Sequence, residues 1–296
     1  MGNSSLASRR ASEVSEMKKI VLTPKAYSKI PIEAEVITPD ALAGKTVENI
    51  KMLKVYVGNG VHDLGEFFDV QGELADTAQE QVIIVDGDAA HIKYIGRGMT
   101  SGEIVIQGNA GMHTGSQMSG GSLTVDGNVD DWAGAEMSGG MLKIMGNAGD
   151  LMGSAYRGSS DGLTGGCIVV NGSVGSEVGS FMRRGMIVVK GDTGSFTGLY
   201  MNGGEIFVFG RLGKRAGAQA KGNGGFIASF GSIEEILPTY IFETTYTPTF
   251  MRLYLRELSE NLGIKEAVQF IGTPLMRYRG DMAVGGSAEI LLAQKG

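Results

Sequence analysis

Few side chains in this sequence belong to the types that bind metal ions or carry out nucleophilic catalysis. The chain of 296 residues contains three histidines and one cysteine, namely His62, His91, His113 and Cys167. Zinc sites use such ligands at short, regular spacings, and these four residues show no such spacing. A single cysteine also excludes a disulfide framework and is typical of proteins of the reducing cytoplasm. We therefore interpret all four residues as structural and expect no metal ion or cofactor bound by this chain.

The acidic residues and the glycine-rich strings do not form a catalytic pattern either. Glu103, Asp126 and Glu205 stand in different columns or distant copies of a repeat, whereas acid–base catalysis needs carboxylates held close together. The string over residues 96–102 lacks the spacing and context of a dinucleotide site, and no Walker pattern or nucleophile elbow occurs. A net charge of −6 argues against nucleic acid as a partner. No apolar run is long enough to predict insertion into a membrane.

A glycine-punctuated repeat organises the middle of the chain. Most of its turn glycines stand 19 residues apart, with a step of 21 at each end and one step of 26 that contains an insertion over residues 156–162. Each copy holds a short strand of alternating aliphatic residues, which indicates the inward face of stacked strands. The inward column consists of Ile83, Ile104, Leu123, Leu142, Ile168, Ile187, Ile206 and Ile227. A column of methionines is interpreted as filler of the same core: Met99, Met118, Met137, Met182 and Met201.

Stacked copies of this repeat bury a continuous core that no single copy could bury. The sequence therefore predicts an all-β fold, a right-handed parallel β-helix (a solenoid) of about eight coils. The predicted organisation is a disordered N-terminal arm over residues 1–16, a small α+β cap over 17–80, the β-helix of 19-residue repeats over 81–235, and a C-terminal helix and strand extension over 236–296.

Within the C-terminal extension, residues 248–262 are expected to form a helix. Pro248 suits the first helical position, and Thr247 is the expected N-cap. The apolar face of this helix is predicted to consist of Phe250, Tyr254, Leu258 and Leu262.

An apolar stripe on the outside of the repeats indicates an interface. The outward-facing strand column includes Val105, Val169, Val188 and Phe207, at positions where water favours polar side chains. A contiguous apolar patch usually marks a contact surface. We expect another polypeptide of a larger assembly to cover this stripe, and cover by the flanks of the chain itself is the alternative.

The insertion is the second candidate for partner contact. A loop added to one coil of a solenoid often lies on a functional face. Tyr156, Arg157 and Asp161 lie in this loop. They are expected to contact the partner, and a passive surface bulge is the alternative.

Several segments carry a resemblance to a known family. Residues 20–25, 39–45, 57–59, 65–69 and 84–88 resemble the N-terminal part of the C-subunit of formylmethanofuran dehydrogenase, and residues 154–158 resemble its insertion. The resemblance runs from about Met17 to the end of the chain. The repeat alone also resembles the C-terminal β-helix domain of glutamate synthase. A formyltransferase/hydrolase complex of methylotrophic bacteria contains a related C-subunit.

The resemblance implies a scaffold subunit of an oxidoreductase complex, without catalytic residues of its own. Such a complex reduces CO2 and fixes it onto methanofuran in methanogenesis, or runs in reverse in methane oxidation. The molybdenum or tungsten pterin, the iron–sulfur clusters and a binuclear metal site are expected in partners, including an amidohydrolase-like subunit and a Mo/W-pterin subunit.

Three alternatives to this function stay open from the sequence. The first is the C-subunit of a formyltransferase/hydrolase complex in one-carbon metabolism. The second is the ammonia-channel domain of a glutamate synthase. The third, of another class, is an independent β-helix enzyme that acts on polysaccharides.

Overall fold

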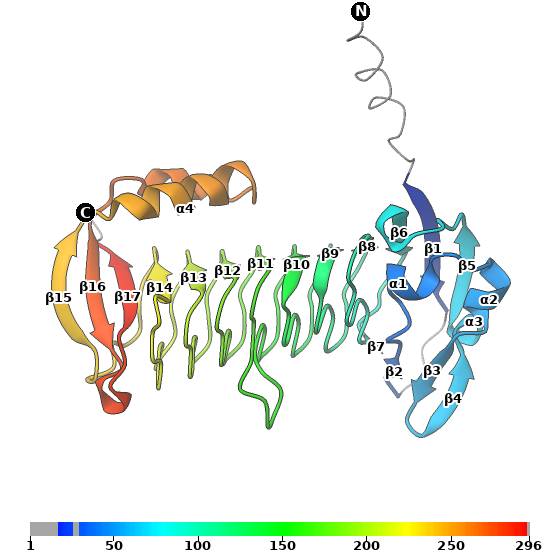
Figure 1. Cartoon of the computed structure of the whole chain (residues 1–296), viewed down its shortest axis with the longest axis horizontal. Helices are drawn as coiled ribbons and strands as arrows, with labels where there is room; N and C mark the ends of the chain where they lie inside the picture. Colours follow the sequence, from blue (N-terminus) through cyan, green and yellow to red (C-terminus); the bar gives the residue numbers. More distant parts are fainter. Residues whose placement is uncertain (1–16, 26–29, 295–296) are drawn as a thin grey trace, which may run out of the picture.

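The computed structural model describes residues 17–25 and 30–294, so the predicted arm over residues 1–16 lies outside the described part. The described chain is mostly β, and thirteen strands form one sheet that runs the length of the molecule (Figure 1). Pairing is parallel in the middle of this sheet and antiparallel near both ends. The parallel strands of the repeats are β6 (Gln81–Val85), β8 (Glu103–Ile106), β9 (Ser119–Val125), β10 (Gly139–Ile144), β11 (Cys167–Val170), β12 (Met186–Val189), β13 (Glu205–Val208) and β14 (Phe226–Ser229).

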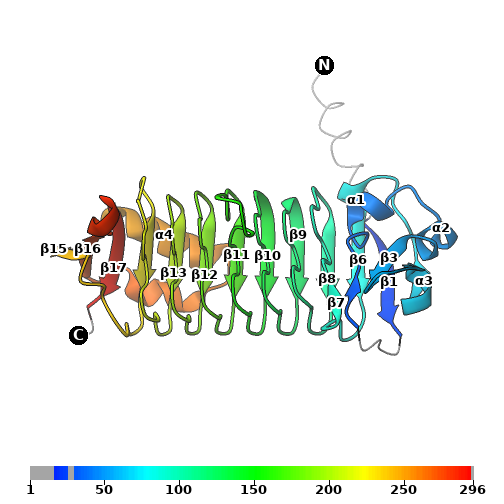
Figure 2. The ribbon, with the colours of Figure 1, turned by 90° about the horizontal axis from the view of Figure 1, so that it is seen from below.

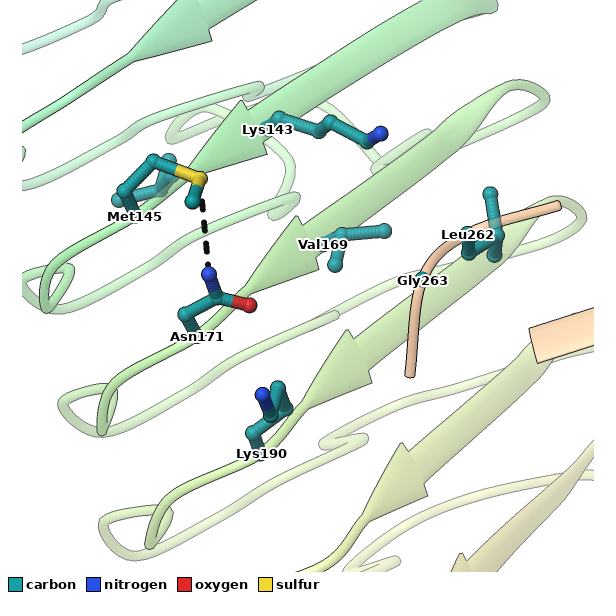
Figure 3. A pocket seen from close by; sticks show the side chains of 8 residues that line it. Lys143, Met145, Val169, Asn171, Lys190, Leu262 and Gly263 are labelled. Carbon is teal, nitrogen blue, oxygen red and sulfur yellow. Dashed lines mark hydrogen bonds between the residues drawn. The ribbon is translucent and has the colours of Figure 1, made fainter. Parts of the chain in front are cut away.

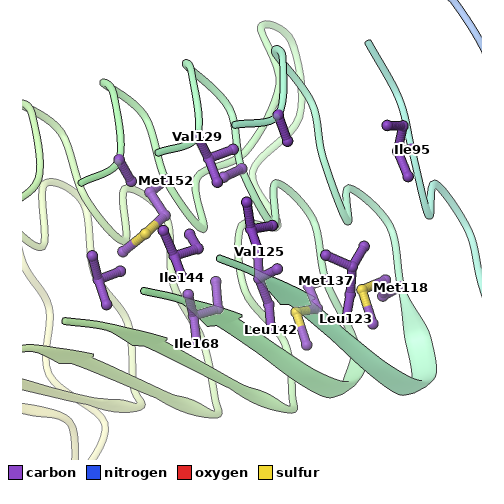
Figure 4. Packing of buried hydrophobic residues seen from close by; sticks show 14 of the residues in the cluster. Ile95, Met118, Leu123, Val125, Val129, Met137, Leu142, Ile144, Met152 and Ile168 are labelled. Carbon is purple, nitrogen blue, oxygen red and sulfur yellow. The ribbon is translucent and has the colours of Figure 1, made fainter. Parts of the chain in front are cut away.

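Each of these strands pairs with the equivalent strand of the next repeat. Ile168 lies beside Ile187, and Ile187 lies beside Ile206. Every residue of the predicted inward column is buried, so its direction is confirmed. The methionine column is buried in the same core, as Met118 and Met137 illustrate (Figure 4).

A second row of extended backbone accompanies the sheet. Isolated parallel bridges join Ala110 to Val129 and Val129 to Ala148, always between successive repeats. Their side chains belong to the same buried cluster as those of the strands. Figure 4 shows Val129 and Leu142 entering this core from different segments.

Close approach between successive repeats explains why glycine recurs in them. Gly134 has a φ of +61°, and a Cβ atom added there would lie 2.6 Å from Cδ1 of Ile168. At Gly139 an added Cβ would lie 2.2 Å from the carbonyl oxygen of Ser119. Any other residue at these two positions would therefore push the stacked repeats apart.

The N-terminal part adds short elements to one end of the sheet (Figure 1). β1 (Lys18–Pro24) pairs parallel with β6, and β5 (Phe68–Gly72) pairs antiparallel with β1. A second sheet has the strand order β4–β3–β2–β7. Its strands and the nearby helices are β2 (Ile32–Glu33), β3 (Lys54–Val57), β4 (Gly60–Asp63), β7 (Ile92–Lys93), α1 (Pro39–Leu42), α2 (Val47–Lys51), α3 (Leu64–Phe67) and the 3-10 helix η1 (Ala78–Glu80).

The C-terminal part extends the other end of the sheet and then lies along its outer face (Figures 1 and 2). The predicted helix is confirmed as α4, with Pro248 rather than Thr247 at the N-cap position. No helix of the described residues is long and apolar enough to cross a membrane. The elements of this part are β15 (Ile241–Tyr246), α4 (Thr249–Glu260), the 3-10 helix η2 (Lys265–Phe270), β16 (Leu275–Gly280), the 3-10 helix η3 (Met282–Val284) and β17 (Ala288–Ala293).

Candidate functional site

Three of the predicted interface residues are buried by the chain itself. Val169, Val188 and Phe207 lie on adjacent strands and expose at most 3% of their surface. They form one hydrophobic cluster with Met251 and Leu255 of α4. The prediction that a partner polypeptide covers these three residues is therefore wrong, because the C-terminal extension brings its own apolar face onto them.

The face that α4 presents to the sheet agrees with the predicted one in part. Met251, Leu255 and Leu258 are buried against the strands, whereas 39% of Phe250 is exposed. Buried residues at i, i+4 and i+7 define one stripe of a helix. Leu258 of the predicted face lies in the cluster, and Tyr254 and Leu262 pack against it. The prediction therefore differs at Phe250 and misses Met251 and Leu255, because sequence spacing alone does not fix how a helix rolls on its sheet.

A hydrogen bond and ring contacts hold the helix on the sheet. The hydroxyl of Tyr254 donates to Oε1 of Glu205 over 3.1 Å. Burial raises the pKa of the Glu205 carboxyl, although this hydrogen bond acts in the opposite direction. The ring of Phe207 packs edge-on against that of Phe226, with centroids 5.5 Å apart. This half of the outer face is therefore an intramolecular core rather than a docking surface.

The other half of the same outer face remains open. Val105 and Thr124 are half-buried, and 47% of Met145 is exposed. None of the three belongs to the cluster under α4, which extends over β11 to β14 (Figure 1). Val105 is thus the predicted stripe residue that keeps a free surface.

A pocket of about 240 Å³ lies where the cover ends and the open face begins (Figure 3). Val169 and Lys143 line it from the strands, and Leu262 lines it from the segment that follows α4. Lys190, also in its wall, pairs with Glu266 over 3.2 Å, whereas Lys143 makes no ion pair with the described residues. A lone ammonium beside an apolar wall suits contact with a carboxylate on a partner.

Among the residues of reactive type, Cys167 is half-buried and His62 lies beside a carboxylate. Burial raises the pKa of the Cys167 thiol to about 12, so the thiolate needed by a nucleophile or metal ligand is scarce at neutral pH. Nδ1 of His62 lies 3.1 Å from a carboxylate oxygen of Glu66. Within residues 17–25 and 30–294, no three His, Cys, Asp or Glu side chains are grouped as metal ligands.

The insertion folds back onto its own repeats, where it projects below β11 in Figure 1. Tyr156 stacks on Trp132 with ring centroids 5.0 Å apart, and its hydroxyl lies 2.9 Å from Nδ1 of His113. Asp161 forms an ion pair with Arg183. Arg157 is exposed and makes no hydrogen bond or ion pair with the described part of the chain. Two of the three predicted contact residues are thus held by their own chain, and Arg157 is free to reach a partner.

The rings beneath the insertion were not predicted. Tyr94, His113 and Trp132 stand 19 residues apart, each with a positive φ, and the first two rings stack with centroids 4.4 Å apart. That equal spacing is the signal that could have revealed them. Burial, helped by the nearby charges of Lys93 and Arg97, lowers the pKa of His113 to about 4. The imidazole is therefore neutral at physiological pH.

Curated relatives match one part of the chain, whereas no protein-family model matches it. Over 100 residues the chain is 47% identical to the C-subunit of tungsten-containing formylmethanofuran dehydrogenase 2 of Methanothermobacter marburgensis, covering 34% of this chain and 37% of that protein. Over 98 residues it is 47% identical to the C-subunit of molybdenum-containing formylmethanofuran dehydrogenase 1 of Methanosarcina barkeri, covering 33% of each. The matches thus span about a third of the length of these relatives.

A solved structure matches nearly the whole chain. It is a chain of the formyltransferase/hydrolase complex from Methylorubrum extorquens, crystallised with methylofuran. The two chains are 30% identical and superpose with a TM-score of 0.84, over 93% of this chain and 100% of the other. A superposition of this extent includes the repeats and also the segments that precede and follow them.

Proposed function

Because the chain belongs to the family that comprises the C-subunits of formylmethanofuran dehydrogenase and of the formyltransferase/hydrolase complex, we propose that it is a non-catalytic scaffold subunit of such a complex. The observation that carries this proposal is the match to a chain of the solved complex over 93% of this chain and 100% of the other. In the dehydrogenase form, the complex reduces CO2 and fixes it onto methanofuran, or runs in reverse. The tungsten and molybdenum relatives are both 47% identical to this chain, so these identities do not indicate which of the two metals the complex would contain.

A second candidate is the C-subunit of a formyltransferase/hydrolase complex. It is supported by the solved relative from such a complex, which superposes on this chain over all of its own length at 30% identity. Both candidates give the chain the same role, that of a body on which partner subunits assemble.

In this proposal the repeats form a right-handed parallel β-helix of about eight coils. Parallel pairing between successive repeats supports it, since each strand continues the sheet of the one before. The second row of parallel bridges, from Ala89 to Thr193, supports it as well. A stack of this kind is a stiff rod whose faces present a fixed pattern to partners.

The pterin, the iron–sulfur clusters and the binuclear metal site belong in this proposal to partner subunits, an amidohydrolase-like subunit and a Mo/W-pterin subunit among them. The state of the reactive side chains supports this division. Cys167 is held as a thiol by burial, and the imidazole of His113 is engaged by Tyr156. The cytoplasmic location expected from the single cysteine stays a prediction.

The proposed partner surface is the open half of the outer face, with Val105 at its centre, together with Arg157 at the insertion. Val105 is half-buried on the sheet, and Lys143 on the same face makes no ion pair within residues 17–25 and 30–294. An apolar centre with a polar rim is the usual composition of a protein interface.

Purification of the native assembly tests this function. The chain, tagged at its N-terminus, is isolated from its own cells under non-denaturing conditions, and its companions are identified by mass spectrometry. We expect it to co-elute at fixed stoichiometry with a pterin-binding subunit and an amidohydrolase-like subunit. Elution of the chain by itself, at the size of its 31.1 kDa, would contradict the proposal.

A further inference from the structure

A second pocket, of about 250 Å³, lies between the insertion and the repeats. Trp132, Tyr156 and Phe181 supply three aromatic rings to its lining. Tyr156 is held in place from two sides, by stacking on Trp132 and by the contact of its hydroxyl with His113. Phe181 stacks in turn on Tyr200, with centroids 4.7 Å apart. The aromatic lining is therefore fixed before any ligand arrives.

Two polar groups of this pocket have no partner in the described chain. Ser180 is 2% exposed, and its Oγ makes no hydrogen bond. The carboxylate of Glu177 makes no hydrogen bond or ion pair with the described residues. Its backbone is fixed, because its amide donates to the carbonyl of Ser195 over 2.8 Å and its carbonyl accepts from Oγ of Ser154 over 2.6 Å. Because Oγ of Ser180 is enclosed, the half-buried carboxylate of Glu177 is the acceptor that a ligand with N–H donors would meet in this pocket.

We infer that this pocket binds a guanidinium group, supplied by an arginine side chain of a partner polypeptide. A guanidinium is flat and cationic, so it stacks on aromatic faces while its N–H groups donate to a carboxylate. An ammonium group has no flat face to stack, and an anionic ligand would meet Glu177 with like charge. The source of the arginine rests on the proposed function, whereas the chemistry of the pocket does not.

Arg157 is the rival occupant. It lines the same pocket from the insertion and carries the same group, but it forms no ion pair with Glu177. If Arg157 filled the pocket in solution, an added guanidinium compound would bind only after its removal. The experiment therefore includes the Arg157→Ala variant.

Binding in this pocket can be followed by tryptophan fluorescence, because Trp132 in its lining is the single tryptophan of the chain. N-acetylarginine amide is titrated into the isolated full-length chain while tryptophan fluorescence is followed. We expect a saturable change that the neutral isostere N-acetylcitrulline amide does not produce. Glu177→Gln should weaken the binding by about five-fold, as loss of a partly exposed ion pair does. Glu260→Gln, a matched change on the exposed side of α4, should bind like the wild type.

Three outcomes with the wild-type and Glu177→Gln chains overturn the inference. They are the absence of a saturable change, an equal response to the citrulline compound, and unchanged binding by Glu177→Gln. Binding by Arg157→Ala but not by the wild type also overturns it, since the occupant is then the chain's own arginine. Phe181→Ala gives a second variant, which should bind more weakly if the aromatic lining contributes.

The source of the arginine is tested in the native assembly. The tagged Glu177→Gln chain should retain several-fold less of its partner subunits than the tagged wild type. Full retention of partners, with arginine amide still bound by the isolated chain, overturns the partner as the source. If the wild-type chain purifies without partners while the titration succeeds, the proposed function fails and the guanidinium pocket stands.

Discussion

At the residue scale, the protonation of His113 makes the stability of the folded chain depend on pH. Its folded pKa is lowered to about 4 from the usual 6.5, chiefly by burial. Well above pH 6.5 the imidazole is neutral in both states and contributes no pH dependence. As pH falls from 6.5 toward 4, the unfolded chain takes up a proton that the folded chain does not, so folding becomes less favourable.

This pH dependence is open to a direct test with His113→Asn. Asparagine does not titrate and tolerates the positive φ of 63° at this position. The urea midpoint is measured at pH 7.5 and pH 5 for both chains. The wild type should lose more stability over this interval than the variant does, and equal losses would show that His113 does not resist protonation in the folded state.

The substitution of one buried side chain tests which face of the strands is turned inward. Ile187 is fully buried in the inward column, so Ile187→Ala should lower the free energy of unfolding by about 2–5 kcal/mol. Gln107→Ala, an exposed neutral position just after β8, serves as the matched control and should change it by less than about 0.5 kcal/mol. Similar small effects in a denaturant titration would mean that the strand faces are reversed.

The inward columns could be predicted from the sequence, whereas the rings beneath the insertion left only their equal spacing as a signal. Aliphatic residues that alternate with polar ones, such as Leu123 and Val125 on either side of Thr124, show which face of the strand points inward, because burial selects for hydrophobicity. Tyr94, His113 and Trp132 lie at corners with positive φ, where no such selection marks the residue type. Their stacking became visible only with the three-dimensional arrangement of the repeats.

At the element scale, α4 decides which part of the outer face is available. The sequence predicts this helix and locates the apolar stripe, yet it does not show that the two meet. Helix propensity and apolar spacing are local properties, while the packing of Tyr254 on Phe207 depends on how the chain returns after β15. Sequence reasoning therefore assigns the stripe to a partner, although most of it is part of the core.

Val188→Asp tests the intramolecular cover. The new carboxylate would lie unpaired among Phe207, Leu255 and their neighbours, at a cost of several kcal/mol. We expect α4 to detach, so that limited proteolysis cleaves the C-terminal extension much faster than in the wild type. An intact, protease-resistant chain that merely loses its partners would restore the rejected interpretation.

Val105→Asp is the matched change on the open half of the same column. Val105 is only half-buried, so the charge can stay hydrated and the chain should keep its thermal stability. In the native purification, however, this variant should lose partner subunits, because a charge is placed at the centre of the proposed contact. A complex of wild-type composition would exclude this half of the face as the interface.

At the scale of the whole molecule, one sheet joins all parts of the chain. It runs from β5 in the N-terminal part, through the repeats, to β15 in the C-terminal part. The period of 19 residues predicts the middle of this sheet, because each repeat offers the same strand to the next. The ends are less predictable, since residues 17–80 and 236–296 carry no repeat, and β1 and β17 join the sheet through contacts that are distant in sequence.

Such a continuous sheet suits a scaffold, because a rigid body holds several binding surfaces at constant distances. In this account the chain contributes surfaces, and its partners contribute the chemistry. The claim that the chain itself performs no step of the reaction is therefore the one to test most directly.

The decisive measurement is the turnover of formylmethanofuran, followed by dye reduction, with the isolated chain and with the purified complex side by side. The isolated chain is expressed in cells that lack the partner genes. A dehydrogenase complex should reduce the dye, and the isolated chain should not exceed a blank without protein. Turnover by the isolated chain would contradict the scaffold account.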